Sequence, residues 1–216
     1  MPLRVRTRST HREIPRSFAA QFDHVADTLP WIDVFLSLAV GIGLAAAVGL
    51  RVFVPLLVLG GASRLGWITL QPDFLWLASN AGLVALSAAT VLEVAAYYIP
   101  AIDNAFDVIA GPAAVVAGIL AIAAVSGDLP PVLRWSLALI AGGGTAGFVQ
   151  GLTTIARLKS TGFTGGLANP ILATFELVGS AGVAVLALTV PLFAIAFVVV
   201  LVFAIRHLRR RNRPAH

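Results

Sequence analysis

The stretch LANPILATFELVGSAGVAVLALTV, residues 167–190, carries a single charged residue, Glu176. About 20 consecutive apolar residues are enough to cross the ~30 Å hydrocarbon core of a bilayer as a helix. A carboxylate inside such a helix costs about 2.5–3.5 kcal/mol on insertion scales and usually faces the bundle interior or a water-filled cavity. The stretch therefore predicts a transmembrane helix whose glutamate points away from lipid.

The composition of the whole chain agrees with this prediction. Of the 216 residues, 58% are hydrophobic and 12% are charged, and the mean hydropathy is +0.92. Soluble domains contain about 25% charged residues, so this chain lacks the polar side chains to cover a surface that faces water. We expect an all-α, polytopic membrane helix bundle that forms one domain over residues 31–206.

Cysteine and histidine usage narrows the chemistry. The chain has no cysteine, which excludes a disulfide framework and a thiolate metal site. Its four histidines lie in polar or basic terminal segments, so we expect neither a metal nor a cofactor inside the bundle. They are His11, His24, His207 and His216.

Arginines are concentrated at the two ends of the chain. Basic segments that flank apolar spans face the cytoplasm, so both termini are expected to be cytoplasmic. We expect the terminal arginines to contact anionic lipid head groups and expect no binding to nucleic acid. The arginines are Arg4, Arg6, Arg8, Arg12 and Arg16 at one end and Arg206, Arg209, Arg210, Arg211 and Arg213 at the other.

Residues 1–30 form a basic arm that contains no signal-peptide pattern. Within it, Phe18, Phe22, Val25 and Leu29 recur at helical spacing, which favours an amphipathic helix on the membrane surface. A disordered arm is the alternative. Residues 207–216 form a basic cytoplasmic tail.

Six spans are expected, and the first is interrupted. The apolar run from Asp33 to about Ala62 would extend roughly 43 Å as one helix, which is too long for a single straight span. Arg51 and Pro55 interrupt the run, so we expect a kinked or re-entrant continuation after the first span. The expected spans cover about residues 33–52, 79–99, 108–126, 132–157, 168–188 and 191–205.

Small residues recur at spacing four in the first and fourth expected spans. Such residues allow helices to approach closely. Three spans separate the matching segments, which suggests two inverted three-helix repeats, residues 33–126 and 132–205. Glycine and alanine are abundant in this chain, so a chance match is the alternative. The residues are Gly41, Ala45 and Gly49, and Gly143, Gly147 and Gly151.

Two glutamates lie within expected spans. Glu93 and Glu176 each lie about six or seven residues from the cytoplasmic end of a span, roughly 10 Å deep, so they could meet. Buried carboxylates can exchange a proton, and a pair can bind a cation. The alternative is that each glutamate stabilises helix packing through a hydrogen bond or an arginine.

Arg51 is the other charged residue within an expected span. Counted from Asp33, it lies towards the outer side. It could hold an anionic substrate group at the broken helix. It could also snorkel to the interface or form a structural pair.

The segment RLKSTGFTGGLANP, residues 157–170, is expected to be a glycine-rich cytoplasmic connector. A helix that begins after glycine-rich chain can bind an anion or a lipid head group. The alternative is an ordinary turn with an Asn cap and proline at the first helical position. The candidate contacts are Arg157, Lys159, Thr164, Gly165, Gly166 and Asn169.

Three segments carry a family resemblance: GLRVFVPLLVLGGASRLG at residues 49–66, LEVAAYYIPAIDNAFD at residues 92–107, and STGFTGGLANPILATFELV at residues 160–178. They resemble the bacterial integral membrane proteins grouped as domain of unknown function 4126. The resemblance covers most of residues 34–205. It implies a multi-span protein of the bacterial inner membrane and no assigned activity.

Three functions fit these observations. The first is a small secondary transporter or permease that uses the intramembrane glutamates as proton or cation sites. The second is a non-catalytic membrane accessory or scaffold protein, in which the charged residues serve packing. The third is a lipid-handling enzyme or flippase that acts at the basic connector. Whether the protein forms a homo-oligomer is left open by the sequence.

Overall fold

The structure is a computed structural model that describes residues 30–96, 100–127, 129–165 and 167–190. The chain divides into two units, Met1–Asp33 and Val34–His216, and every contact given below lies within the second unit. Several expectations fall outside the described residues. They are the surface helix in residues 1–30, Gly166, the sixth span at 191–205 and the basic tail.

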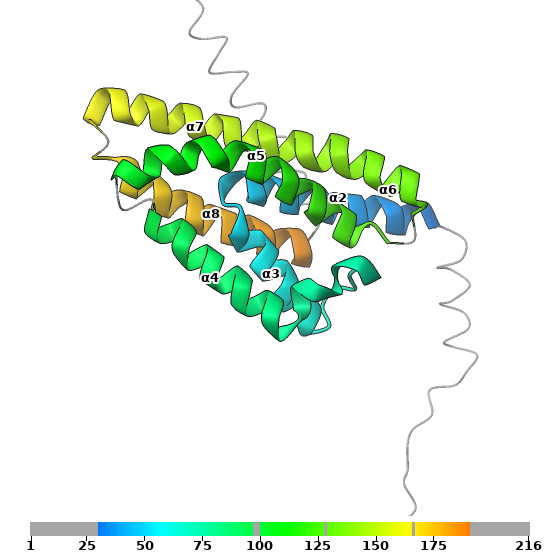
Figure 1. The fold of residues 1–216 in the computed structure, drawn as a ribbon. Helices are drawn as coiled ribbons and strands as arrows, with labels where there is room; N and C mark the ends of the chain where they lie inside the picture. Colours follow the sequence, from blue (N-terminus) through cyan, green and yellow to red (C-terminus); the bar gives the residue numbers. More distant parts are fainter. Residues whose placement is uncertain (1–29, 97–99, 128, 166, 191–216) are drawn as a thin grey trace, which may run out of the picture. The chain divides into compact units, whose positions relative to one another are not determined.

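All described elements are helical (Figure 1). In chain order they are α2 (Pro30–Leu50), α3 (Phe53–Arg64), the 3-10 helix η1 (Pro72–Ala78), α4 (Asn80–Ala96), α5 (Pro100–Val125), α6 (Pro131–Leu137), the π-helix η2 (Ala138–Gly143), α7 (Gly144–Thr164) and α8 (Asn169–Thr189). By length and composition, three helical stretches could cross a membrane: Asp33–Leu50, Pro131–Thr164 and Asn169–Thr189. A fourth is added if η1 and α4, which meet at 63°, count as one bent span.

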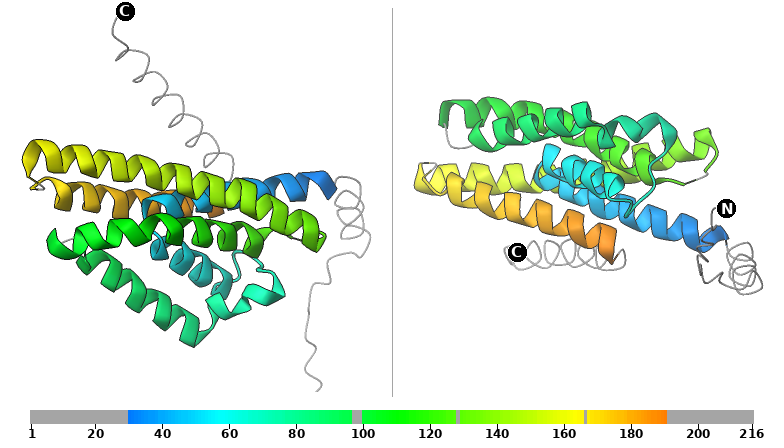
Figure 2. Two further views of the ribbon diagram at one scale, coloured as in Figure 1. Left: turned by 45° about the horizontal axis from the view of Figure 1, so that its top comes forward. Right: turned by 90° about the horizontal axis from the view of Figure 1, so that it is seen from below.

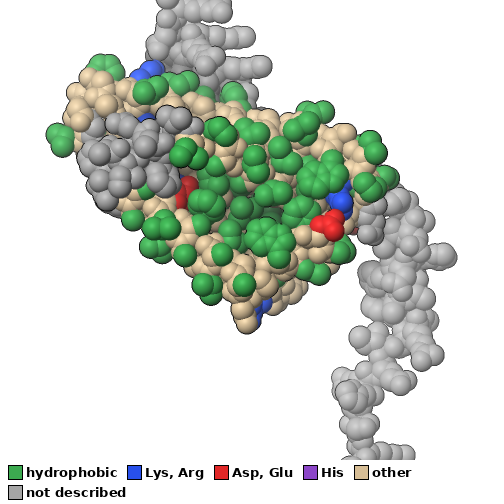
Figure 3. All heavy atoms as spheres, in the orientation of Figure 1, with side chains coloured by type: hydrophobic (Ala, Val, Ile, Leu, Met, Phe, Trp, Pro, Cys, Tyr) green, Lys and Arg blue, Asp and Glu red, His purple; other side chains and the backbone are tan. Residues whose placement is uncertain are grey.

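The surface of these helices is strongly apolar. Val132, Phe163 and Phe175 are 81%, 89% and 72% exposed. Figure 3 shows hydrophobic side chains spread over the face that it displays. Soluble monomers rarely expose apolar patches this extensive, so the helices are compatible with a membrane protein.

The first expected span is broken, as the sequence predicts. The last helical bond of α2 runs from the amide of Arg51 to the carbonyl of Ala47. Pro55 lacks an N–H, and its ring would clash with the carbonyl of Arg51 in a continuous helix. The chain therefore leaves the helix at Arg51 and begins α3 at Phe53. With 12 residues, α3 is about 18 Å long and is too short to cross a bilayer alone.

Glycines bring α2 and α5 into close contact with the continuous helical stretch Pro131–Thr164, which comprises α6, η2 and α7 and is called the α6–α7 rod. A Cβ atom added at Gly142 would lie 2.4 Å from the carbonyl oxygen of Gly118, and one added at Gly49 would lie 2.6 Å from that of Ala146. A Cβ atom at Gly151 would meet no atom within 4 Å. The predicted small-residue contacts thus include Gly49 but not Gly151.

The helix directions contradict the inverted repeat. Gly41 contacts Ile122 and Val125 of α5, whereas Gly49 contacts the segment of α7 that packs near Gly118. Helix α2 is therefore antiparallel to α5. Helix α7 is also antiparallel to α5, because Gly142 meets Gly118 while Gly147 meets Val115. As a result, α2 and α7 run in the same direction (Figure 2). An inverted repeat requires opposite directions, so the prediction of an inverted repeat is wrong for this pair.

The expected connector at residues 157–170 is largely helical. Helix α7 continues to Thr164 and ends at Gly165, whose φ of 63° lies in the left-handed region that favours glycine. The amide of Gly165 donates to the carbonyl of Thr161 over 2.9 Å. The expected boundary was too early, because polar residues such as Lys159 are tolerated on an exposed helix face.

Candidate functional site

Glu93 caps the N-terminus of α3 from another helix. Its Oε1 accepts a hydrogen bond from the amide of Val52 over 2.8 Å, and its Oε2 accepts one from the amide of Phe53 over 3.1 Å. The first amides of a helix have no partner within the helix, and this end carries partial positive charge. Glu93 lies on α4 and is only 4% exposed. A carboxylate on one helix therefore fixes the start of the broken helix segment.

Glu176 on α8 binds two arginines. Arg157 donates to it with two nitrogens: Nε lies 3.2 Å from Oε1, and Nη2 contacts Oε2. Nη2 of Arg51 lies 3.4 Å from Oε2 and donates to the carbonyl of Ala173 over 2.8 Å. The three side chains join the C-terminal end of α2 to α7 and α8, and each residue is more than nine-tenths buried.

Arg51 connects the two acids electrostatically. The charge of Arg51 attracts the carboxylate of Glu93, whereas the charge of Glu176 repels that carboxylate. Glu93 and Glu176 thus lie near each other, but their hydrogen bonds go to different partners. The expectation that Arg51 lies at the opposite end from Glu176 is wrong, and so is the snorkelling alternative. The reason is that α2 runs towards the start of α8, so Arg51, the residue that follows α2, meets Glu176.

The remaining connector residues mostly complete the α7–α8 turn. Nδ2 of Asn169 donates to Oγ1 of Thr161 over 3.2 Å, and the hydroxyl of Thr164 donates to the carbonyl of Ser160 over 2.7 Å. The predicted Asn cap is displaced by one residue, because Ala168 caps α8 and Asn169 is its first residue. Lys159 is exposed, while Arg157 is buried against Glu176. Arg157 and Lys159, which were predicted to act together on an anion, therefore lie in different surroundings.

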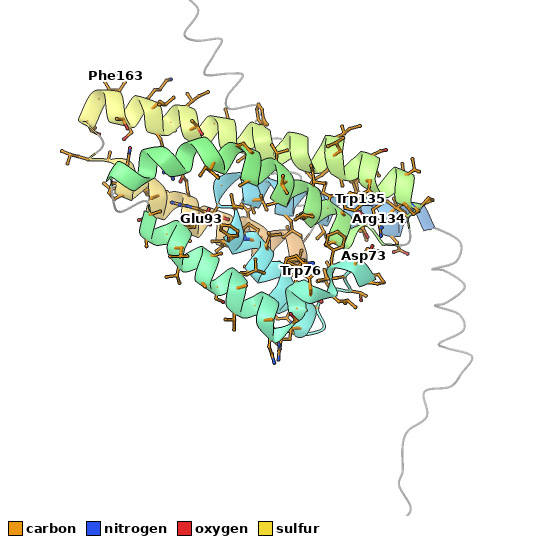
Figure 4. The ribbon with its side chains drawn as sticks, in the orientation of Figure 1. Asp73, Trp76, Glu93, Arg134, Trp135 and Phe163 are labelled. Atoms are coloured by element: carbon orange, nitrogen blue, oxygen red, sulfur yellow. The ribbon has the colours of Figure 1, made fainter. Side chains whose placement is uncertain are left out.

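Two adjoining cavities lie along α4 and α5, and the smaller one reaches Glu93. One has a volume of about 270 Å³ and includes Glu93 in its lining. The other, of about 630 Å³, shares Val52, Phe53, Ile109 and Ala113 with the first. We call them together the α4–α5 groove. Figure 3 shows a hollowed hydrophobic area on this face, and Figure 4 places Glu93 towards one end with Arg134, Asp73 and Trp135 gathered at the other.

A third cavity lies against Glu176. It has a volume of about 330 Å³ and is lined by α2, α7 and α8. Apart from Glu176 and Thr153, its described lining is apolar or glycine. Each intramembrane acid that the sequence singled out therefore borders a separate apolar cavity.

Two further polar contacts were not among the predicted site residues. The hydroxyl of Ser180, which is fully buried, donates to the carbonyl of Ala47 over 2.9 Å. Ser180 lies four residues after Glu176 and hence on the same helix face, which is a signal that could have identified it. At the other end of the groove, Arg134 donates to Oε1 of Gln71 over 3.0 Å and lies 3.4 Å from Asp73. That contact depends on the turn after α5 and has no local sequence signal.

Within the described part of the chain, no group of three or more His, Cys, Asp or Glu side chains could hold a metal ion. Comparison with curated proteins gave no significant match, and comparison with solved structures gave none. A family model described as "Domain of unknown function (DUF4126)" matches residues 38–211. The matched region includes the broken helix, Glu93, Glu176 and both of its arginine partners, and the chain therefore belongs to this family of unknown function.

Proposed function

We propose that the protein is a multi-pass membrane protein of the bacterial inner membrane that works as a small secondary transporter. Glu93 is its proton-exchanging group and α3 its moving element. One observation carries the proposal: the buried carboxylate of Glu93 fixes the first two amides of a half-helix at a break. Broken helices whose ends meet a charged group are a recurrent construction in secondary transporters.

Proton binding at Glu93 would loosen α3. An ionised carboxylate accepts hydrogen bonds at both oxygens, and bonds to a charged acceptor are roughly twice as strong as neutral ones. A neutral carboxylic acid keeps weaker acceptor capacity and adds a donor. Uptake of a proton would therefore weaken the bonds to Val52 and Phe53. Helix α3 could then shift while Arg51 stays attached to α8 through Glu176 and Ala173.

Glu176 is better suited to anchoring than to proton exchange. Protonating it would uncouple the carboxylate from both Arg157 and Arg51, leaving buried cations with less compensation. Breaking a buried pair in this way is strongly unfavourable. We therefore assign Glu176, Arg51 and Arg157 to a fixed framework and Glu93 to the proton site.

Infrared difference titration of the purified protein tests this assignment. We expect a carboxylic-acid band that changes with pH, disappears in Glu93→Gln and remains in Glu176→Gln. The Gln variants keep the size of the side chain. If the only titrating intramembrane band is lost in Glu176→Gln instead, the two roles are reversed and the proposal fails.

A membrane scaffold is the second candidate, because the Glu176 cluster and the glycine contacts favour tight fixed packing. It predicts that neither glutamate titrates and that α3 does not move. A lipid-handling enzyme is less favoured, because Arg157, its main head-group candidate, is buried against Glu176.

A further inference from the structure

The α4–α5 groove combines apolar walls with one acid. Among the described residues that line its two cavities, Glu93 is the one charged side chain. The rest are apolar or aromatic, and the volumes of about 270 and 630 Å³ suit a small organic molecule. A molecule that fits this groove must be apolar over most of its surface, and it gains from a positive charge near Glu93.

Aromatic rings add a second preference for a cation. Phe53 lines both cavities beside Glu93, and Trp76 lines the larger one. A cation within about 6 Å of an aromatic face is attracted to the ring, and this attraction is stronger where water is excluded. Phe53 is also the residue whose amide Glu93 binds. A ligand at this position would therefore contact the acid and the start of α3 together.

The other charges leave the carboxylate available to a ligand. Arg51 and Glu176 are the described charged groups that act on Glu93, and neither lines the α4–α5 groove. Arg51 is directed to Glu176 and to the carbonyl of Ala173 on α8. A carboxylate has about four acceptor positions, and the two amides occupy one on each oxygen. Capacity for a further positive partner remains.

We infer that the α4–α5 groove binds a lipophilic cation, a mainly apolar molecule with one positive charge, at Glu93. This inference rests on the proposed function and names its substrate class. The cation and a proton compete for the same carboxylate, so binding of one cation displaces the proton that a protonated Glu93 carries. The exchange needs no other reactant, and it makes the protein an antiporter of protons and lipophilic cations.

The full-length protein in detergent tests this with two ions of nearly the same size and opposite charge. Tetraphenylphosphonium is the probe cation and tetraphenylborate is the matched anion, and binding is measured by equilibrium dialysis. We expect the cation to bind at pH 8, with an affinity that falls about tenfold or more at low pH and in Glu93→Gln. Equal binding of both ions, or undiminished cation binding in Glu93→Gln, would overturn the inference.

A second pair of variants covers the case in which Glu93→Gln does not fold. Ile109→Trp should fill the groove beside Glu93, because Ile109 lines both cavities, and should abolish cation binding. Val84→Trp is the matched control, because Val84 is 70% exposed and does not line the groove. Equal effects of the two substitutions, or cation binding that survives Ile109→Trp, would place the cation elsewhere.

The outcomes separate the two proposals. If Glu93 titrates in the infrared experiment but the cation does not bind, the substrate class is wrong and the proton site stands. If the cation binds through Glu93 but no proton is released, the binding site stands and the coupled transport fails.

Discussion

At the scale of single residues, the pairing of Glu176 with arginines determines the free-energy cost of burying its charge. An isolated buried carboxylate would be far more expensive than the same group beside guanidinium groups. Arg157 meets Glu176 with two nitrogens, a geometry that Arg forms and Lys cannot. The ionic group therefore depends on each member being present.

Removing one partner should be costly. We expect Arg157→Met to lower the free energy of unfolding by about 3–5 kcal/mol, because it leaves part of the charge of Glu176 without its closest partner. Thermal unfolding in detergent measures this loss. Lys159→Met, two residues along the same helix and exposed, is the control and should change stability by less than about 0.5 kcal/mol. Equal effects would mean that the pair contributes little.

At the scale of helices, backbone contact between glycines determines how closely α5 approaches the α6–α7 rod. Gly118 and Gly142 face each other, and a Cβ atom on either one would lie within 2.6 Å of the other's carbonyl oxygen. The π-helical segment Ala138–Gly143 lies against α5 at this point. Here the packing depends on the absence of side chains.

Substitution by alanine, which adds one methyl group, distinguishes glycines in tight helix contacts from glycines that face open space. We expect Gly142→Ala to destabilise the protein by about 1–3 kcal/mol, because the added carbon overpacks the contact with Gly118. We expect Gly151→Ala to be neutral or to stabilise by up to about 1 kcal/mol, because open space surrounds that position and alanine favours a helix. Chemical unfolding of both variants in detergent gives the comparison. A loss of stability at Gly151 would mean that a partner covers this face.

At the scale of the whole molecule, the direction of α2 determines which ends of the helices share a side. Because α2 and α7 run in parallel, the Val34 end of α2 and the Lys159 end of α7 point in opposite directions. The sequence analysis placed both on the cytoplasmic side. If the arginine-rich arm keeps the Val34 end in the cytoplasm, the Lys159 end faces outward.

Cysteine labelling tests this arrangement without background, because the chain contains no cysteine. In intact cells, a membrane-impermeant maleimide reaches the outer side only, so we expect it to label either Leu167→Cys alone or Val34→Cys and Val132→Cys without Leu167→Cys. Val132 and Leu167 are 81% and 85% exposed. If Val34→Cys and Leu167→Cys are both labelled, the parallel arrangement of α2 and α7 is wrong.

The helical class, the break near Arg51 and Pro55, and the two buried glutamates could be predicted from the amino-acid sequence. Those features follow from hydropathy, proline geometry and the cost of a charge among apolar neighbours, and all three act locally along the chain. The family assignment likewise followed from sequence segments and is confirmed by the match over residues 38–211.

The partners of the charged side chains and the relative directions of the helices could not be predicted from the sequence and follow from the folded structure. Nothing in the local sequence shows that Glu93 binds the amides of Val52 and Phe53, about 40 residues away, or that Arg51 meets Glu176. The short helix α3 turns the chain back after α2. The number of apolar residues in this segment does not distinguish such a return from a complete crossing of the membrane. Helix directions and ion pairs arise from packing between distant segments, which hydropathy along one segment does not encode.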